Sequence, residues 1–221
     1  MTWVKICGIT NLDDARAAVE AGADALGFVF YEKSPRNIEF DRAREIVSSL
    51  NGDVETVGVF VNQDPGKMIE VAHKLGLKAV QLHRTNLFHQ DQRGVAGVSA
   101  DDIKVYFVFP ASGFRWPSEP GSTDRSGIAG IFLDSGTEQQ PGGTGNTFDW
   151  KEARRLVSAM SQDVNVIVAG GLTPENVAGA IEMLHPYGVD VSSGVEAKPG
   201  KKDSQRVRAF IRAVRQADET A

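Results

Sequence analysis

Short apolar runs recur along the whole chain and alternate with longer stretches of mixed polarity. The runs are rich in Val, Ile and Phe, which favour strands, and most are bounded by Gly, Asp or Asn. We predict eight strands, at residues 3–7, 25–30, 56–62, 79–83, 104–109, 128–134, 165–169 and 189–192. Runs that are apolar on both faces are typical of strands buried inside a parallel sheet.

Amphipathic stretches with helical spacing lie between many of these runs. They predict helices near residues 13–21, 39–50, 64–75, 149–160, 174–184 and 203–216, with 217–221 frayed. Two have clear starts, because Thr173 and Asp64 are each followed by a proline suited to the first helical position.

The alternation of strands and helices predicts parallel βαβ units, and eight of them suggest closure into an α/β fold, a (β/α)8 TIM barrel. We expect one barrel domain over residues 1–221. An open doubly wound sheet is the rival, but no Gly-x-Gly-x-x-Gly follows the first strand. The fifth crossover is expected to be irregular, because residues 111–127 are rich in Pro, Ser and Gly and lack helical periodicity.

Composition and charge narrow the class of protein. A net charge of −5 with no basic block argues against nucleic-acid binding. We expect no membrane span, because no apolar run approaches about 18 residues. A single cysteine excludes an intrachain disulfide and fits a reducing compartment, and with no recognisable signal peptide we expect a cytoplasmic protein. Neither the four His residues nor the cysteine shows metal-ligand spacing, so no metal is expected.

Strand parity directs several polar side chains toward the barrel axis. In barrels of this kind the active site lies at the carboxyl ends of the strands, and side chains alternate between the two faces of a strand. The inward polar residues at this end are Lys5, Cys7, Gln81, His83, Asp134, Asp190 and Ser192. Taken singly, each has a structural interpretation as a small core residue, a turn cap or a satisfied buried histidine. Together they favour a site at one mouth.

Glycines after the last two strands indicate a phosphate site. Gly170-Gly171 follows the seventh strand and Ser193-Gly194 follows the eighth, where barrels often bind phosphate through backbone N–H groups. Arg36, after the second strand, is suited to bidentate capture of a carboxylate, although a surface turn is the simpler interpretation. A third cluster, at residues 142–145, is expected to form a wall or lid.

Several motifs together resemble one enzyme family over nearly the whole chain. They are KICGIT at 5–10, GFVF at 27–30, SPR at 34–36, VGVFVN at 57–62, VQLH at 80–83, LD at 133–134, GGTG at 142–145, FDW at 148–150, AGGL at 169–172 and DVSSGVE at 190–196. This set resembles the N-(5′-phosphoribosyl)anthranilate isomerases of tryptophan biosynthesis, which are cofactor-free barrels. The chain differs from the family pattern at Arg84, where glycine is usual.

The resemblance implies an Amadori rearrangement of an aminoaldose to an aminoketose. It implies Cys7 as general base, Asp134 as general acid and Arg36 as the contact for the anthranilate carboxylate. Gly170, Gly171, Ser193 and Gly194 match the phosphate site, and we place His83, Asp190 and Ser192 among the other substrate contacts. The partner is then a phosphorylated small molecule, and the protein a monomer or homodimer.

The proposed acid and base both need pKa values away from their free values. A protonated Asp134 at pH 7 needs a pKa raised by about 3 units, and a thiolate at Cys7 needs one lowered by about 1–2 units. Lys5, one inward layer below Cys7, is placed to help the thiolate. Two alternatives stay open: the related isomerase of histidine biosynthesis, which uses two aspartates, and a phosphate-binding barrel without catalysis.

Overall fold

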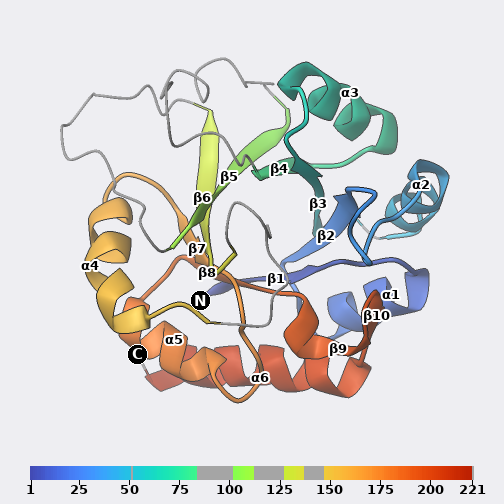
Figure 1. Cartoon of the computed structure of the whole chain (residues 1–221). Coiled ribbons are helices and arrows are strands. Elements are labelled where there is room, and N and C mark those ends of the chain that lie inside the picture. Colours follow the sequence, from blue (N-terminus) through green and yellow to red (C-terminus); the bar gives the residue numbers. More distant parts are fainter. Residues whose placement is uncertain (51, 84–101, 112–126, 137–146, 221) are drawn as a thin grey trace.

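The protein forms a closed eight-stranded parallel barrel in the order β1-β2-β3-β4-β5-β6-β7-β8, with helices around its outside (Figure 1). This computed structural model describes residues 1–50, 52–83, 102–111, 127–136 and 147–220. The strands are β1 (Trp3–Cys7), β2 (Ala25–Phe30), β3 (Glu55–Val61), β4 (Ala79–His83), β5 (Lys104–Pro110), β6 (Ile128–Asp134), β7 (Val166–Val168) and β8 (Gly188–Val191). All eight predicted strands are confirmed, and no end differs by more than one residue.

The six predicted helices are also present. They are α1 (Leu12–Glu20), α2 (Phe40–Ser48), α3 (Pro65–Leu75), α4 (Trp150–Met160), α5 (Val177–Leu184) and α6 (Ser204–Thr220). The side chain of Asp64 caps α3 by accepting the backbone N–H of Lys67, as expected. α5 begins three residues later than predicted, at Val177. Thr173 still caps the turn before it, because its hydroxyl accepts the N–H of Glu175 while the side chain of Asn176 accepts the N–H of Thr173.

Strand parity separates two apolar layers. A large outer layer, which includes Ile6, Ile131 and Leu133, packs between the barrel and the helices. A smaller inner layer fills the barrel and includes Val57, Phe132 and Ile167. Residues on alternate positions therefore face opposite ways, as the sequence predicts, and the polar residues at the strand ends share the inner face.

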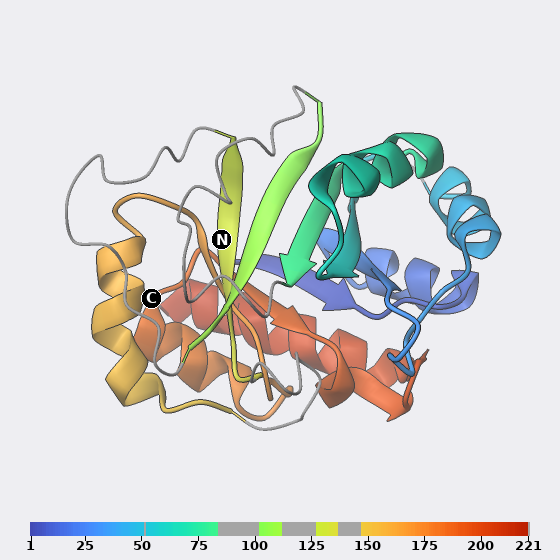
Figure 2. The ribbon, with the colours of Figure 1, turned by 45° about the horizontal axis from the view of Figure 1, so that its top comes forward.

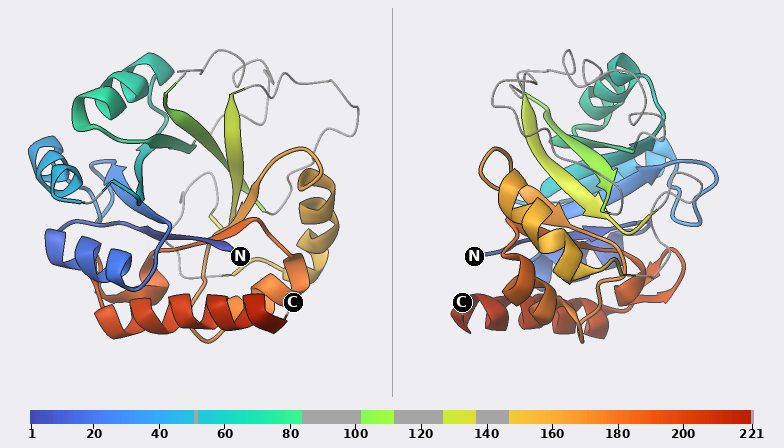
Figure 3. Two further views of the ribbon diagram at one scale, coloured as in Figure 1. Left: turned by 180° about the vertical axis from the view of Figure 1, so that it is seen from behind. Right: turned by 60° about the vertical axis from the view of Figure 1, so that its left-hand side comes forward.

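The C-terminal part of the chain closes the barrel against its N-terminus. In Figures 2 and 3 the two termini lie on the same side, with α6 running beside α5 under the barrel. The predicted fraying of 217–221 is wrong for the described residues up to 220, because Ala217 is buried and the Asp218 carboxylate accepts both the backbone N–H and the hydroxyl of Thr2.

Between β8 and α6 lie elements that the hydrophobic pattern does not predict. A short 3-10 turn, η2 (Ser193–Val195), leads into a hairpin of β9 (Glu196–Lys198) and β10 (Lys201–Lys202). The hairpin is tied to the first turn of α1, because Asp14 accepts the backbone N–H of Lys202 and pairs with Lys201. It therefore brings a buried lysine, Lys202, beneath one side of the barrel mouth.

Several sequence-based expectations lie outside the described residues. These are Arg84, nearly all of the irregular fifth crossover at 111–127, and the glycine cluster at 142–145. No helix within the described ranges is long and apolar enough to cross a membrane.

Candidate active site

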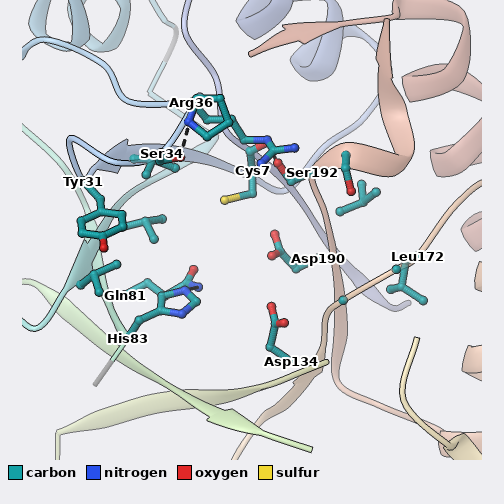
Figure 4. A pocket seen from close by; sticks show the side chains of 18 of the residues that line it. Cys7, Tyr31, Ser34, Arg36, Gln81, His83, Asp134, Leu172, Asp190 and Ser192 are labelled. Atoms are coloured by element: carbon teal, nitrogen blue, oxygen red, sulfur yellow. Dashed lines mark hydrogen bonds between the residues drawn. The ribbon is translucent and has the colours of Figure 1, made fainter. Parts of the chain in front are cut away.

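A cavity of about 430 Å³ opens at the carboxyl ends of the strands (Figure 4). Cys7, His83, Asp134 and Asp190 come from four different strands or strand ends and all line it. The other lining residues are Val29, Tyr31, Lys33, Ser34, Pro35, Arg36, Val59, Val61, Gln81, Gly170, Gly171, Leu172, Val191, Ser192 and Ser193. Of the ten predicted site residues, nine line this cavity, and only Gly194 does not.

Cys7 lies at the end of β1 with its sulfur toward the cavity (Figure 4). The following Gly8 has a φ of +80°, and a methyl group there would lie 2.6 Å from Cδ of Arg36. Glycine at this position therefore allows the sharp turn and lets Arg36 cross above it. Burial raises the pKa of the Cys7 thiol more than the charge of Lys5 lowers it. The resting group is consequently a thiol, contrary to the lowered pKa that a base requires.

Asp134, at the end of β6, faces Cys7 across the cavity (Figure 4). Burial raises the pKa of its carboxyl to about 6, although the backbone N–H of Gly136, 2.6 Å from Oδ1, stabilises the ionised form. The charge of Asp190 acts in the same direction as burial. The shift has the direction expected for a general acid that must hold a proton near neutral pH.

Lys5 and Asp190 form a buried ion pair directly under this mouth. The Nζ of Lys5 lies 2.9 Å from Oδ1 of Asp190, and the Lys5 side chain has no solvent exposure. Nζ also lies 4.9 Å from the centre of the Phe132 ring. Asp190 thus has a partner below the cavity while still lining it.

His83 is held neutral beside a glutamine. Burial lowers the pKa of its imidazole to about 4, and the charge of Lys5 adds to this effect. Its Nε2 lies 3.2 Å from the amide nitrogen of Gln81. In this orientation Nε2 accepts, so the ring proton is on Nδ1. The amide oxygen of Gln81 is buried without a partner among the described residues and is available to a ligand donor.

Arg36 is anchored rather than free. Its Nε and Nη2 each donate to one carboxylate oxygen of Glu196 at 2.8 Å, a bidentate pair. Burial opposes the charge of Glu196, but the hydrogen bond from Arg36 and the charge of Lys202 outweigh it and lower the pKa of that carboxyl. Glu196 therefore occupies one edge of the guanidinium, and among the described residues the Nη1 donors have no protein acceptor.

The two glycine loops meet edge to edge. Gly170 and Gly171 have φ values of +85° and +65°, and a methyl group on Gly194 would lie 1.9 Å from the carbonyl oxygen of Leu172. Gly194 thus permits the close approach of the loops rather than lining the cavity. Within the described residues, the backbone N–H groups of Gly171, Ser193 and Gly194 donate to no protein acceptor. The loops present unused donors of the kind that bind anions.

Sequence reasoning missed one charged component of the site. Lys202 looks like part of a solvated basic stretch, yet its Nζ donates to Glu196 Oε1 at 3.0 Å and to the carbonyl of Ser192 at 3.1 Å. Lys202 reaches Glu196 and Ser192 only because β9 and β10 form a hairpin, and no sequence motif indicates these contacts. In the described part of the chain, no cluster of three or more His, Cys, Asp or Glu side chains is arranged to hold a metal ion.

Comparison with known proteins gives one consistent family. Residues 4–213 match the family model described as N-(5'phosphoribosyl)anthranilate (PRA) isomerase. A curated N-(5'-phosphoribosyl)anthranilate isomerase of Rubrobacter xylanophilus is 45% identical over 216 residues, covering 97% of this chain and 100% of the relative.

Solved structures agree with this result. The monomeric form made from a dimeric phosphoribosylanthranilate isomerase of Thermotoga maritima has a TM-score of 0.76 and 38% identity, covering 98% of this chain and all of that one. A phosphoribosyl anthranilate isomerase in complex with reduced 1-(o-carboxyphenylamino)-1-deoxyribulose 5-phosphate has a TM-score of 0.76 and 37% identity, with the same coverage.

Proposed function

This chain belongs to the N-(5′-phosphoribosyl)anthranilate isomerase family, and we propose that Cys7 and Asp134 are the general base and general acid of its reaction. It is an isomerase that performs an Amadori rearrangement in tryptophan biosynthesis, converting N-(5′-phosphoribosyl)anthranilate to 1-(2-carboxyphenylamino)-1-deoxyribulose 5-phosphate. The observation that carries the assignment is the pair itself: a carboxyl with a pKa of about 6 and a thiol line one cavity.

The reaction needs one proton delivered and one removed. Asp134 gives its proton to the ring oxygen of the ribose, and the C1′–O bond breaks to leave an iminium between C1′ and the anthranilate nitrogen. Cys7 then takes the proton from C2′, and the electron pair of that C–H bond neutralises the iminium to give an enolamine. Tautomerisation of the enolamine yields the aminoketose. Acid and base help of this kind is typically worth about 10²–10⁴-fold for each group.

In the free enzyme the shared proton is on Cys7, whereas the reaction needs it on Asp134. Near neutral pH Cys7 is a thiol, because its pKa is raised above an ordinary value that already exceeds 7, and Asp134 is mostly ionised, because its raised pKa of about 6 is still below 7. The reactive form has the same number of protons, with the proton on Asp134 and a thiolate at Cys7. The reactive form is therefore a minor form of the free enzyme, and groups that stabilise the thiolate increase its population.

The rest of the cavity supports a substrate with two anionic ends. The unused N–H groups of Gly171 and Ser193, which line the cavity, suit the phosphate, and the Nη1 donors of Arg36 suit the anthranilate carboxylate. Glu196 holds the guanidinium in a fixed orientation, which lowers the entropy lost on binding. His83, Asp190 and Ser192 also line the cavity and are left for the sugar hydroxyls.

We extend the proposal to the protein as a whole: one barrel domain, acting in the cytoplasm as a monomer or a homodimer. The single cysteine is suited to a reducing compartment. The relative from Thermotoga maritima is described as dimeric.

The direct test is to follow the loss of anthranilate-type fluorescence when purified protein meets N-(5′-phosphoribosyl)anthranilate. Wild type is expected to turn over the substrate, and Cys7→Ser and Asp134→Asn to lose at least about 10²-fold in kcat while keeping the wild-type circular dichroism. Asp41→Asn, on the exposed surface of α2, is the matched control. No rate above the uncatalysed one in wild type contradicts the function, and near-normal kcat in either variant removes that residue from the mechanism.

A further inference from the structure

Lys5 is a charged residue inside the barrel that stability alone does not explain. Its side chain is fully buried, and its only ion-pair partner among the described residues is Asp190. Replacing a buried ion pair with apolar residues of similar volume is often neutral or stabilising. A barrel interior filled by Phe132, Val57 and Ile167 has no structural need for an ammonium group.

Lys5 lies immediately below the sulfur of Cys7. The two side chains are two residues apart on β1 and point to the same inner face. A methyl group on Gly27, the neighbour on β2, would lie 2.7 Å from Sγ of Cys7 and 3.1 Å from Cε of Lys5. The end of the Lys5 side chain and the Cys7 sulfur therefore both pack against Gly27, and the absence of a side chain on Gly27 makes room for both.

Asp190 keeps this lysine charged. Burial lowers the pKa of Lys5, but the charge of Asp190, joined by that of Cys7 when Cys7 is ionised, outweighs it, so the pKa is raised and the ammonium persists at neutral pH. The effect of Lys5 on the Cys7 thiol also exceeds the opposing effect of Asp190. The ion pair thus leaves a net positive influence at the sulfur.

We propose that Lys5 is a positioning residue that holds a positive charge under Cys7 and so stabilises the thiolate form that accepts the C2′ proton. The inference rests on the proposed role of Cys7 as base. Other charged or titratable groups that act on Cys7 or line its cavity are Lys202 on β10, Asp190 on β8, Asp134 on β6, His83 on β4, and Tyr31, Lys33 and Arg36 after β2. Of the groups that influence the pKa of Cys7, Lys5 has the largest favourable effect on the thiolate.

The single cysteine allows a test that needs no substrate. The rate of Cys7 alkylation by iodoacetamide, measured from pH 6 to 10, reports the thiolate directly, because no other thiol contributes. Lys5→Met keeps the apolar stem and removes the charge. We expect alkylation at pH 8 to be slower by about tenfold and the pH profile to move upward, because a nearby charge is worth one or more pKa units while nucleophilicity compensates for part of the change.

Two further variants keep the test decisive. Lys5→Met leaves Asp190 unpaired, so the double variant Lys5→Met/Asp190→Asn removes both charges and is expected to be about threefold slower than wild type. Lys198→Met, on the exposed strand β9, is the control and keeps the wild-type profile. Folding is checked by circular dichroism, and a folded double variant suffices if the single variant is unstable.

The isomerase assay gives a second and separate readout. Lys5→Met is expected to lower kcat by about tenfold or more with KM changed by less than about threefold, because the charge acts on the proton transfer rather than on binding. A folded variant with an unshifted alkylation profile overturns the proposal for Lys5. Absence of isomerase activity in wild type, with the alkylation shift still present, overturns the proposed function and leaves the effect of Lys5 on Cys7 supported.

Discussion

Asp134→Asn is expected to make the protein more stable at neutral pH while it removes the general acid. A partly buried carboxyl whose pKa is about 6 in the folded protein, against an ordinary 3.8, keeps its proton after the unfolded chain has lost it. The unfolded state then binds fewer protons, so the free energy of unfolding falls as pH rises between these values. An amide at this position does not ionise, and it retains an oxygen for the N–H of Gly136.

The size of the effect follows from the two pKa values. A shift of one unit is worth about 1.4 kcal/mol, so the full difference corresponds to roughly 3 kcal/mol. Below pH 3.8 both states are protonated and this cost is absent. The cost increases as the pH rises toward 6 and is constant above it. The free-energy advantage of Asp134→Asn over wild type is therefore expected to grow from about 1 kcal/mol at pH 4.5 to about 3 kcal/mol at pH 8.

Urea unfolding at a series of pH values between 4.5 and 8 measures this difference. Wild type, Asp134→Asn and the exposed control Asp41→Asn are compared at equal ionic strength, with m-values checked for a common two-state transition. The control is expected to follow wild type throughout. A constant difference between wild type and Asp134→Asn across this range would refute the raised pKa, and with it the reason for choosing Asp134 as the acid.

Three further predictions concern substrate binding, loop packing and the opposite end of the barrel. Arg36→Met is expected to raise KM by about tenfold or more with a smaller effect on kcat, measured by steady-state fluorescence; an unchanged KM would show that the guanidinium does not touch the substrate. Gly194→Ala places a methyl group 1.9 Å from a backbone oxygen and is expected to lower the melting temperature and raise KM, whereas Gly52→Ala, which meets open space, leaves both unchanged. Tyr106→Phe removes a donor to the buried Glu55 at the amino end of the strands and is expected to cost about 1–3 kcal/mol in urea unfolding with kcat unchanged; a large loss of kcat would contradict the separation of stability from chemistry in this barrel.

The barrel could be predicted because its pattern is local. Eight apolar runs, separated by amphipathic segments, require a parallel sheet with both faces covered, and the two-residue period of a strand puts Cys7 and Asp134 on the inner face. The glycine pair after β7 is also a local signal, since Gly170 and Gly171 have positive φ values that other residues adopt only rarely.

The predictions that differ from the structure concern segments whose conformation depends on contacts with another part of the chain. The start of α5 depends on how Asn176 folds back on Thr173, and the order of the last turn of α6 depends on the contact of Asp218 with Thr2, far away in sequence. The ion pair of Arg36 was missed for the same reason: its partner in the protein, Glu196, comes from a hairpin with no signature in the hydrophobic pattern.

For this protein the sequence by itself determined the barrel, which end of the barrel holds the site, and most of the residues that line it, because each follows from periodicity and from the order of the strands. The tertiary structure alone decided the charge states. Burial holds Cys7 as a thiol and raises the pKa of Asp134 to about 6, and Asp190 keeps Lys5 charged beneath the sulfur. A pKa depends on desolvation and on the distance to other charges, and neither quantity exists until the chain has closed on itself.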